Sequence, residues 1–165
     1  MVTLRLTRKL QKFLGVDYAE ELKPATNTLG DWYANGIGTD AGDLILFVNA
    51  RTLLSVAVPI SEADKLAGWF PLRVANLLGM IGVPPTSIEK ELRSYDHIQF
   101  GKTISRSVLG SLNDLAYQYQ AYAEQSAGEK SLSLSRAELE MSKTPFKLID
   151  HRFPLEAALE LLASQ

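Results

Sequence analysis

The pattern of hydrophobic and polar residues is clearest between Ile104 and Ala123, where it predicts one long amphipathic helix. Its apolar arc holds Val108, Leu109, Leu112, Leu115, Ala116, Tyr119, Tyr122 and Ala123. The opposite arc is polar, yet Arg106 and Asp114 are the only charged residues in the whole stretch. Because a helix face in water is normally rich in lysine and glutamate, this charge-poor polar face, from Arg106 to Gln120, indicates contact with another surface or a ligand.

Shorter stretches of the chain alternate or run apolar in the way that strands do. Strands are expected at Thr3–Leu6, Asp31–Ile37, Leu44–Val48, Leu53–Val58 and His97–Lys102. The second, third and fourth of these follow one another through short turns and predict a meander. Leu44–Val48 is an unbroken apolar run, which is typical of a strand that is covered on both faces.

Helices are expected between and after these strands. Thr7 can cap the first of them. Its apolar side holds Leu10, Phe13 and Leu14. Three further pairs have the spacing of a capping box: Ser61 with Asp64, Thr86 with Glu89, and Ser135 with Glu138. The helix expected at Ser61–Ile81 contains Pro71, which predicts a kink or a break.

These elements predict a single α+β domain over residues 1–165. We expect a mainly antiparallel sheet of about four to five strands, packed by several helices. The helices at Ser61–Ile81 and Ser105–Ala123 should cover the sheet, because its buried strands need apolar cover on both faces. The sequence contains no internal repeat and no low-complexity segment that would divide this domain.

The composition is typical of a soluble globular protein, with 46% hydrophobic and 22% charged residues. The absence of cysteine excludes disulfides and thiolate metal sites and is compatible with a reducing compartment. The basic N-terminus lacks the apolar run of a signal peptide, and no run is long enough to span a membrane. We therefore expect a cytoplasmic protein without membrane contact.

Signatures of metal and cofactor chemistry are absent from the sequence. His97 and His151, the only histidines, lie in no metal-ligand spacing, so we expect no metal site. Gly36-Ile-Gly38 lacks the third glycine and the following helix of a phosphate-binding loop. We expect no cofactor, and the pattern identifies no catalytic residue.

The strongest candidate site lies along the long helix. Lys102 and Arg106 flank its N-terminal amides, an arrangement that can hold a phosphate or a carboxylate. The candidate site residues are Lys102, Arg106, Asn113, Asp114 and Tyr117. The competing interpretation is that Arg106 pairs with an internal carboxylate while Asn113 and Asp114 bond nearby backbone.

Two classes of function use this helix. We expect a binding or interaction module whose partner, a protein or a small anionic ligand, contacts the charge-poor polar face. The alternative is a small hydrolase or transferase that acts on an anionic substrate through Lys102, Arg106, Asn113 and Asp114. The sequence leaves both open.

A third class, nucleic-acid binding, depends on the basic N-terminal segment. Its positive residues are Arg5, Arg8, Lys9 and Lys12. Such a cluster is more often the solvated face of a short helix, and Asp17, Glu20 and Glu21 follow it directly. Because the net charge of the chain is -2, nucleic-acid binding is the least favoured of the three classes.

The end of the long helix predicts self-association as a homodimer. Tyr117, Gln118, Tyr119, Gln120 and Tyr122 place phenols and amides close together. Tyrosine suits interfaces because its ring buries a large area while its hydroxyl keeps a hydrogen bond. Tyr119 and Tyr122 lie on the apolar arc and can belong to the core, so the prediction rests on Tyr117, Gln118 and Gln120. The competing interpretation is an ordinary exposed helix end.

Several blocks of the chain resemble a known family. They are WYAN (Trp32–Asn35), LFVN-x-x-T (Leu46–Thr52), RSVLGSLNDLA (Arg106–Ala116), LRLTRKL (Leu4–Leu10) and TPF (Thr144–Phe146). On these blocks the chain resembles a family of uncharacterised bacterial proteins, a domain of unknown function, over nearly its whole length. The resemblance implies a bacterial or archaeal intracellular setting and supplies no activity, cofactor or catalytic residue.

Overall fold

The computed structural model describes residues 1–126 and 133–163. In chain order its elements are β1 (Val2–Leu6), α1 (Arg8–Leu14), β2 (Trp32–Ile37), β3 (Leu44–Asn49), β4 (Ser55–Pro59), a 3₁₀ helix (Ile60–Lys65), α2 (Leu66–Met80), α3 (Pro85–Leu92), a second 3₁₀ helix (Arg93–Asp96), β5 (Ile98–Lys102), α4 (Arg106–Gln125), α5 (Leu134–Met141), a 3₁₀ turn (Lys147–Ile149) and α6 (Pro154–Ala163). Each strand that the sequence predicts is present, and so is the long helix, as α4. None of the described helices is long and apolar enough to cross a membrane.

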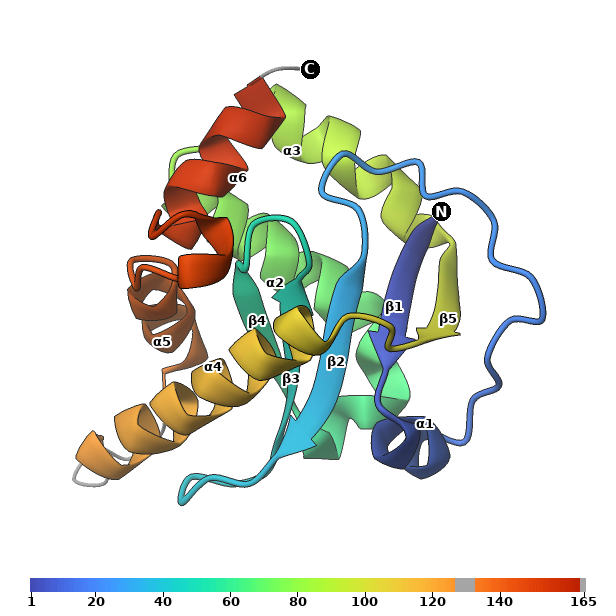
Figure 1. Cartoon of the computed structure of the whole chain (residues 1–165), viewed down its shortest axis with the longest axis horizontal. Coiled ribbons are helices and arrows are strands. Elements are labelled where there is room, and N and C mark those ends of the chain that lie inside the picture. The colour runs from blue at the N-terminus through green and yellow to red at the C-terminus, as the bar shows by residue number, and fades with distance from the viewer. Residues whose placement is uncertain (127–132, 164–165) are drawn as a thin grey trace.

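A five-stranded sheet in the order β4-β3-β2-β1-β5 forms the centre of the molecule (Figure 1). β2, β3 and β4 are the antiparallel meander that the sequence predicts. β1 runs parallel to both of its neighbours, β2 and β5. The structure therefore confirms the α+β class, and the sheet is mixed because long connections return the chain to its starting end before β2 and before β5.

Helices cover the sheet on both faces, as predicted for the two longest ones. On one face Phe70 of α2 packs against Trp32 and Phe47, with ring centroids 5.4 Å and 4.5 Å apart. On the other face lies α4 (Figure 1), whose Leu112 and Tyr119 are completely buried. The alternation of side chains along β2 and β3 thus divides the core into two layers, one under each helix.

The helix caps agree with the sequence only in part. Thr7 caps α1 and accepts the N–H of Leu10, as predicted. The three capping boxes are wrong, because Lys65, Pro84 and Ser133 occupy the cap positions of α2, α3 and α5. The proline pair Pro84-Pro85 begins α3 without a side-chain cap, since proline has no N–H to satisfy in the first turn. α2 continues through Pro71 without a break, and the change from 3₁₀ to α helix occurs earlier, before Leu66.

The connection between α1 and β2 passes the outer edge of β5 before it returns to the sheet (Figure 1). Ala19 donates its N–H to the carbonyl of Phe100 at 2.9 Å. The Gln99 side chain bonds both the N–H and the carbonyl of Lys23, at 3.0 Å and 2.7 Å. Further on, the fully buried carboxylate of Glu91 accepts the N–H of Leu29 at 3.0 Å. This segment covers the outer edge of β5. It does not cover the end of β2 beyond Ala34, where β2 has no pairing with β1.

Candidate functional site

The residues predicted as a site do not come together in a cavity. Lys102 ends β5, while Arg106, Asn113, Asp114 and Tyr117 lie along the outer face of α4, and all five are exposed. Within residues 1–126 and 133–163, their side chains form no hydrogen bond or ion pair. The internal partners of the competing interpretation are therefore absent from the described chain. This face is open to a partner but does not enclose a small substrate.

The residues predicted for a homodimer at the end of α4 divide between core and surface. Tyr119 is fully buried, and its hydroxyl bonds that of Ser55 at 2.9 Å. Gln120 donates to the carbonyl of Gly38 at 2.8 Å and so holds the β2–β3 turn. Tyr117 alone of this group is strongly exposed, at 72%. The structure thus uses most of these side chains within the subunit.

Two of the sequence blocks build the fold. Asn49 of the LFVN-x-x-T block accepts the N–H and the hydroxyl of Thr52, both at 2.9 Å, and donates to the carbonyl of Leu29 at 2.9 Å. Trp32 of the WYAN block donates to the hydroxyl of Tyr95 at 3.0 Å inside the core. These residues close the β3–β4 turn and anchor β2, so the fold alone explains why they are present.

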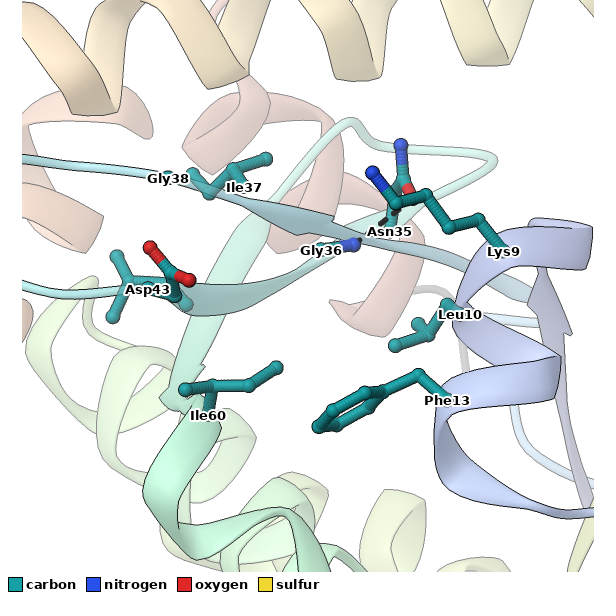
Figure 2. Close-up of a pocket in the computed structure, with 10 residues that line it drawn as sticks. Lys9, Leu10, Phe13, Asn35, Gly36, Ile37, Gly38, Asp43 and Ile60 are labelled. Atoms are coloured by element: carbon teal, nitrogen blue, oxygen red, sulfur yellow. Dashed lines mark hydrogen bonds between the residues drawn. The ribbon is translucent and has the colours of Figure 1, made fainter.

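A pocket of about 230 Å³ opens at one end of the sheet, between α1, the β2–β3 turn and the first 3₁₀ helix (Figure 2). It is lined by Lys9, Leu10, Phe13, Asn35, Gly36, Ile37, Gly38, Asp43, Leu44 and Ile60. β1 ends at Leu6, opposite Ala34, so β2 extends beyond it with a strand neighbour on the β3 side only. The pocket therefore lies beyond the carboxyl end of β1, where sheets that contain parallel strands commonly bind ligands.

The floor of the pocket is apolar. Figure 2 shows Leu10 and Phe13 of α1 and Ile60 pointing into the space below Gly36. Leu10 is buried, but Phe13 keeps 61% of its surface exposed, although the sequence places both on the apolar side of the helix. A Cβ at Gly36 would meet nothing within 4 Å. The glycine thus leaves open a space that a larger residue would fill.

Polar groups lie at the rim of the same pocket. The Asn35 side-chain oxygen accepts the hydroxyl of Thr7 at 2.6 Å and the N–H of Gly36 at 2.9 Å. Its two lone pairs are thereby occupied, and the amide nitrogen remains as a donor. Figure 2 shows the Lys9 ammonium on the same side as this amide and the Asp43 carboxylate at the opposite end. The rim therefore offers a cation and a neutral donor at one end and an acceptor at the other.

A wider pocket of about 600 Å³ lies on the other side of α1. Its lining residues are Leu14, Val16, Ala63, Asp64, Leu66, Ala67, Pro71, Tyr95, Asp96, Ile98 and Phe100. The Tyr95 hydroxyl donates to Glu91 within the core, so it is not available to a ligand. Asp64 and Asp96 are exposed, and the lining contains no cation. The smaller pocket therefore has the richer set of groups for recognition.

Of the basic segment that the sequence singles out, only Lys9 lines the smaller pocket. Arg5 of the basic segment pairs with Asp31 at 2.6 Å, which leaves Arg8, Lys9 and Lys12 exposed on α1. Among the residues that the structure describes, no three acidic or histidine side chains are grouped to hold a metal ion. The basic surface is thus smaller than the sequence indicates.

The carboxylate whose pKa is raised by burial is Glu138, which the sequence pattern assigns to a helix cap. Glu138 is fully buried and pairs with Arg73 of α2, while its Oε2 accepts the N–H of Ala57 at 2.9 Å. Burial raises the pKa of Glu138 to about 7, against the opposing effect of the Arg73 guanidinium and these hydrogen bonds. Burial likewise raises the pKa of Tyr119, and the nearby Glu138 charge adds to the effect. No local spacing reveals such a pair, because Arg73 and Glu138 are distant in sequence.

Comparison with known proteins identifies a family. A family model described as "Domain of unknown function (DUF6933)" matches residues 3–157. No curated protein and no solved structure matches the chain. The match agrees with the resemblance seen in the sequence blocks, and the family description states no activity.

Proposed function

Because the chain belongs to the DUF6933 family, a domain of unknown function, we propose a role from its own geometry: it is a binding module for a small anionic molecule with an apolar body. The ligand occupies the pocket between α1 and the β2–β3 turn. The observation that carries this proposal is the apolar floor of Leu10, Phe13 and Ile60, which Gly36 leaves open beneath a polar rim.

The apolar floor supplies most of the binding free energy in this proposal. Phe13 is more than half exposed, so a ligand that covers its ring removes apolar surface from water, at roughly 25 cal/mol per Å². The pocket of about 230 Å³ is smaller than the roughly 300–1,000 Å³ of sites for drug-sized molecules. The ligand is therefore expected to be small, with one ring or a short aliphatic chain.

The polar rim supplies the orientation of the ligand. β2 has no strand neighbour on the α1 side beyond Ala34, so a molecule on the apolar floor can reach Lys9 and Asn35 past this edge. The ammonium and the amide both donate hydrogen bonds, which favours a carboxylate or a similar anion at that end. Asp43, at the other end, disfavours a second negative charge on the ligand.

The test fills the pocket without disturbing the fold. Phenylacetate and hexanoate are titrated into labelled protein, and we expect NMR shift changes around Phe13 and Ile60. Gly36→Leu should abolish these changes, because the new side chain enters open space in the pocket. Gly110→Leu is the matched control, since its Cβ also meets nothing within 4 Å but lies on α4. Absent shifts in the unmodified protein, or equal binding by Gly36→Leu, would contradict the proposal.

A second candidate function uses the outer face of α4, where the side chains of Arg106, Asn113, Asp114 and Tyr117 lack partners within the described residues. This is the protein-interaction role, and the hydrolase or transferase alternative uses the same residues. Arg106→Ala combined with Asp114→Ala, in a protein that stays folded, should abolish partner capture or turnover if either role is correct. We also propose a cytoplasmic location, which cell fractionation tests, and self-association, whose surface is considered next.

A further inference from the structure

α2 exposes an apolar face that carries no charge. Three of the eight large apolar or aromatic side chains exposed among the described residues lie on this helix: Trp69 at 41%, Leu72 at 63% and Met80 at 38%. Arg73 is the only charged residue of α2, and it is engaged with the buried Glu138. A helix face in contact with water alone normally carries lysine or glutamate, so this face is unusual for a surface.

The exposed residues of α2 form two rows on either side of Leu72. At about 100° per residue, Gly68, Ala75 and Gly79 fall along one side of Leu72. Trp69, Asn76 and Met80 fall along the other side. One row is therefore small and the other is large, over a helix of 15 residues that is about 22 Å long.

No contact within residues 1–126 and 133–163 explains the small row. Glycine inside a helix is less favourable than alanine because it loses more backbone freedom on folding. A Cβ at Gly68 or at Gly79 would meet nothing within 4 Å, so no neighbour within the described chain requires either glycine. Glycine in such a position permits close approach of another backbone.

The polar groups of this face already have partners. The Trp69 indole N–H donates to Glu62 at 3.2 Å, and the Asn76 amide donates to the hydroxyl of Ser135 at 3.1 Å. Covering the face would leave these donors paired. The charged groups beside it are Glu62 and Lys65, just before the start of α2, which pair with each other. The rest of the face carries no charge, so its desolvation costs little.

We propose that this face of α2 is a homodimer interface, in which it packs against α2 of a second copy of the chain. A two-fold axis parallel to the helices sets the large row of each helix against the small row of the other. Leu72 then meets Leu72 of the second copy on the axis. A nucleic acid or a charged peptide would find charges only at one end of this face, where Glu62 and Lys65 pair with each other, whereas a second copy offers the matching rows.

The size of the face sets the strength of the dimer. One helix of about 22 Å buries less than the roughly 800 Å² per partner of a standard stable complex. We therefore expect a dissociation constant in the micromolar range, with monomer and dimer both populated in a dilution series. The interface is separate from the small-ligand pocket, so the two proposals stand or fall independently.

Sedimentation equilibrium over a range of micromolar concentrations tests the interface. Leu72→Glu should raise the dissociation constant at least about tenfold, because it places two like charges on the axis. Ile104→Glu is the matched control, since Ile104 is an apolar side chain exposed at 74% away from α2. Gly79→Leu should also weaken the dimer, while the subunit stays folded because leucine favours the helix and its Cβ enters open space.

Three results would overturn the proposal. The first is a monomer at every concentration. The second is a dimer that both Leu72→Glu and Gly79→Leu leave intact. The third is a dimer that Tyr117→Glu dissociates while the α2 variants do not, which would place the interface on α4. Circular dichroism of each variant distinguishes dissociation from unfolding.

Discussion

Replacing Glu138 by alanine is expected to lower the free energy of unfolding by about 4 kcal/mol. Glu138 of α5 is fully buried, and both of its carboxylate oxygens are engaged. Oε1 pairs with Arg73 of α2, and Oε2 accepts the N–H of Ala57 at 2.9 Å and Arg73 Nε at 3.3 Å. β4, which contains Ala57, is an edge strand of the sheet. This one side chain therefore joins α5, α2 and the free edge of β4.

The magnitude follows from what each partner loses. Removing one member of a buried ion pair costs roughly 3–5 kcal/mol, and an orphaned buried N–H costs roughly 1–3 kcal/mol. The Arg73 side chain keeps 17% of its surface exposed, so water relieves part of its loss. Glu138→Gln keeps an oxygen for the N–H of Ala57 and should cost about half as much as Glu138→Ala.

The stability contribution of Glu138 should also depend on pH. Burial raises its pKa from the ordinary 4.5 to about 7 in the folded protein, so between these values the folded state binds the extra proton. The part of the stability that comes from this bound proton is therefore fully present below about pH 4.5 and is lost as the pH rises through about 7, whereas the pairing with Arg73 belongs to the charged form. The slope is at most about 1.4 kcal/mol per pH unit. Glu138→Gln has no such proton and should lack this fall.

Urea unfolding followed by circular dichroism measures these changes at several pH values. Glu140→Ala is the matched control, because Glu140 is exposed on the same helix and its loss should cost less than about 0.5 kcal/mol. A loss below about 1 kcal/mol for Glu138→Ala would refute the role given to the pair. The same slope between pH 5 and 7 in the unmodified protein and Glu138→Gln would refute the pH dependence.

Three further predictions concern the core, a turn and the N-terminal helix. Phe47→Asp should unfold the protein, seen as loss of the thermal transition, because Phe47 is fully buried in the central layer and a charge there has no partner. Asn49→Ala should lower the free energy of unfolding by about 2 kcal/mol in urea titration, since Thr52 loses two hydrogen bonds; an unchanged midpoint would contradict this. Arg8→Glu with Lys9→Glu should leave retention on DNA or RNA columns unchanged, and salt-sensitive retention that this variant removes would favour nucleic-acid binding.

The strands and the two covering helices could be predicted because their signals are periodic and local. Leu44–Val48 shows its burial directly in sequence, and the alternating arcs of α4 give both its length and its buried face. The helix starts were less predictable. When an acid follows a serine by three residues, it can complete a capping box or form an ion pair with a distant residue instead. At Ser135 the acid is Glu138, which turns away from the cap toward Arg73. A long-range ion pair competes with the local cap, and the local sequence does not show which of the two interactions forms.

The pocket could not be predicted, because three separate segments form it. Phe13 shares the apolar side of α1 with Leu10, and periodicity alone assigns both to the core. Whether the sheet reaches far enough to cover Phe13 depends on where β1 ends, and that depends on its pairing with β2. The sequence pattern around Gly36 suggests only a phosphate-binding loop, which it does not complete. In the structure Gly36 matters because it has no side chain and so leaves the pocket open. The candidate residues of α4 share one exposed face of that helix, and none of them lines either pocket.

α2 and α4 show why a charge-poor helix face needs the structure for its interpretation. In α4 the missing charges are replaced by polar groups, so the outer face tolerates water whether or not a partner binds. In α2 they are replaced by Trp69, Leu72 and Met80, so water contact exposes apolar surface. The sheet covers one side of α2, and α3, α5 and the first 3₁₀ helix also contact it, yet these three side chains stay exposed. Part of the apolar surface of α2 is therefore left uncovered within the described residues, and we propose a second copy as its cover because its large and small rows match.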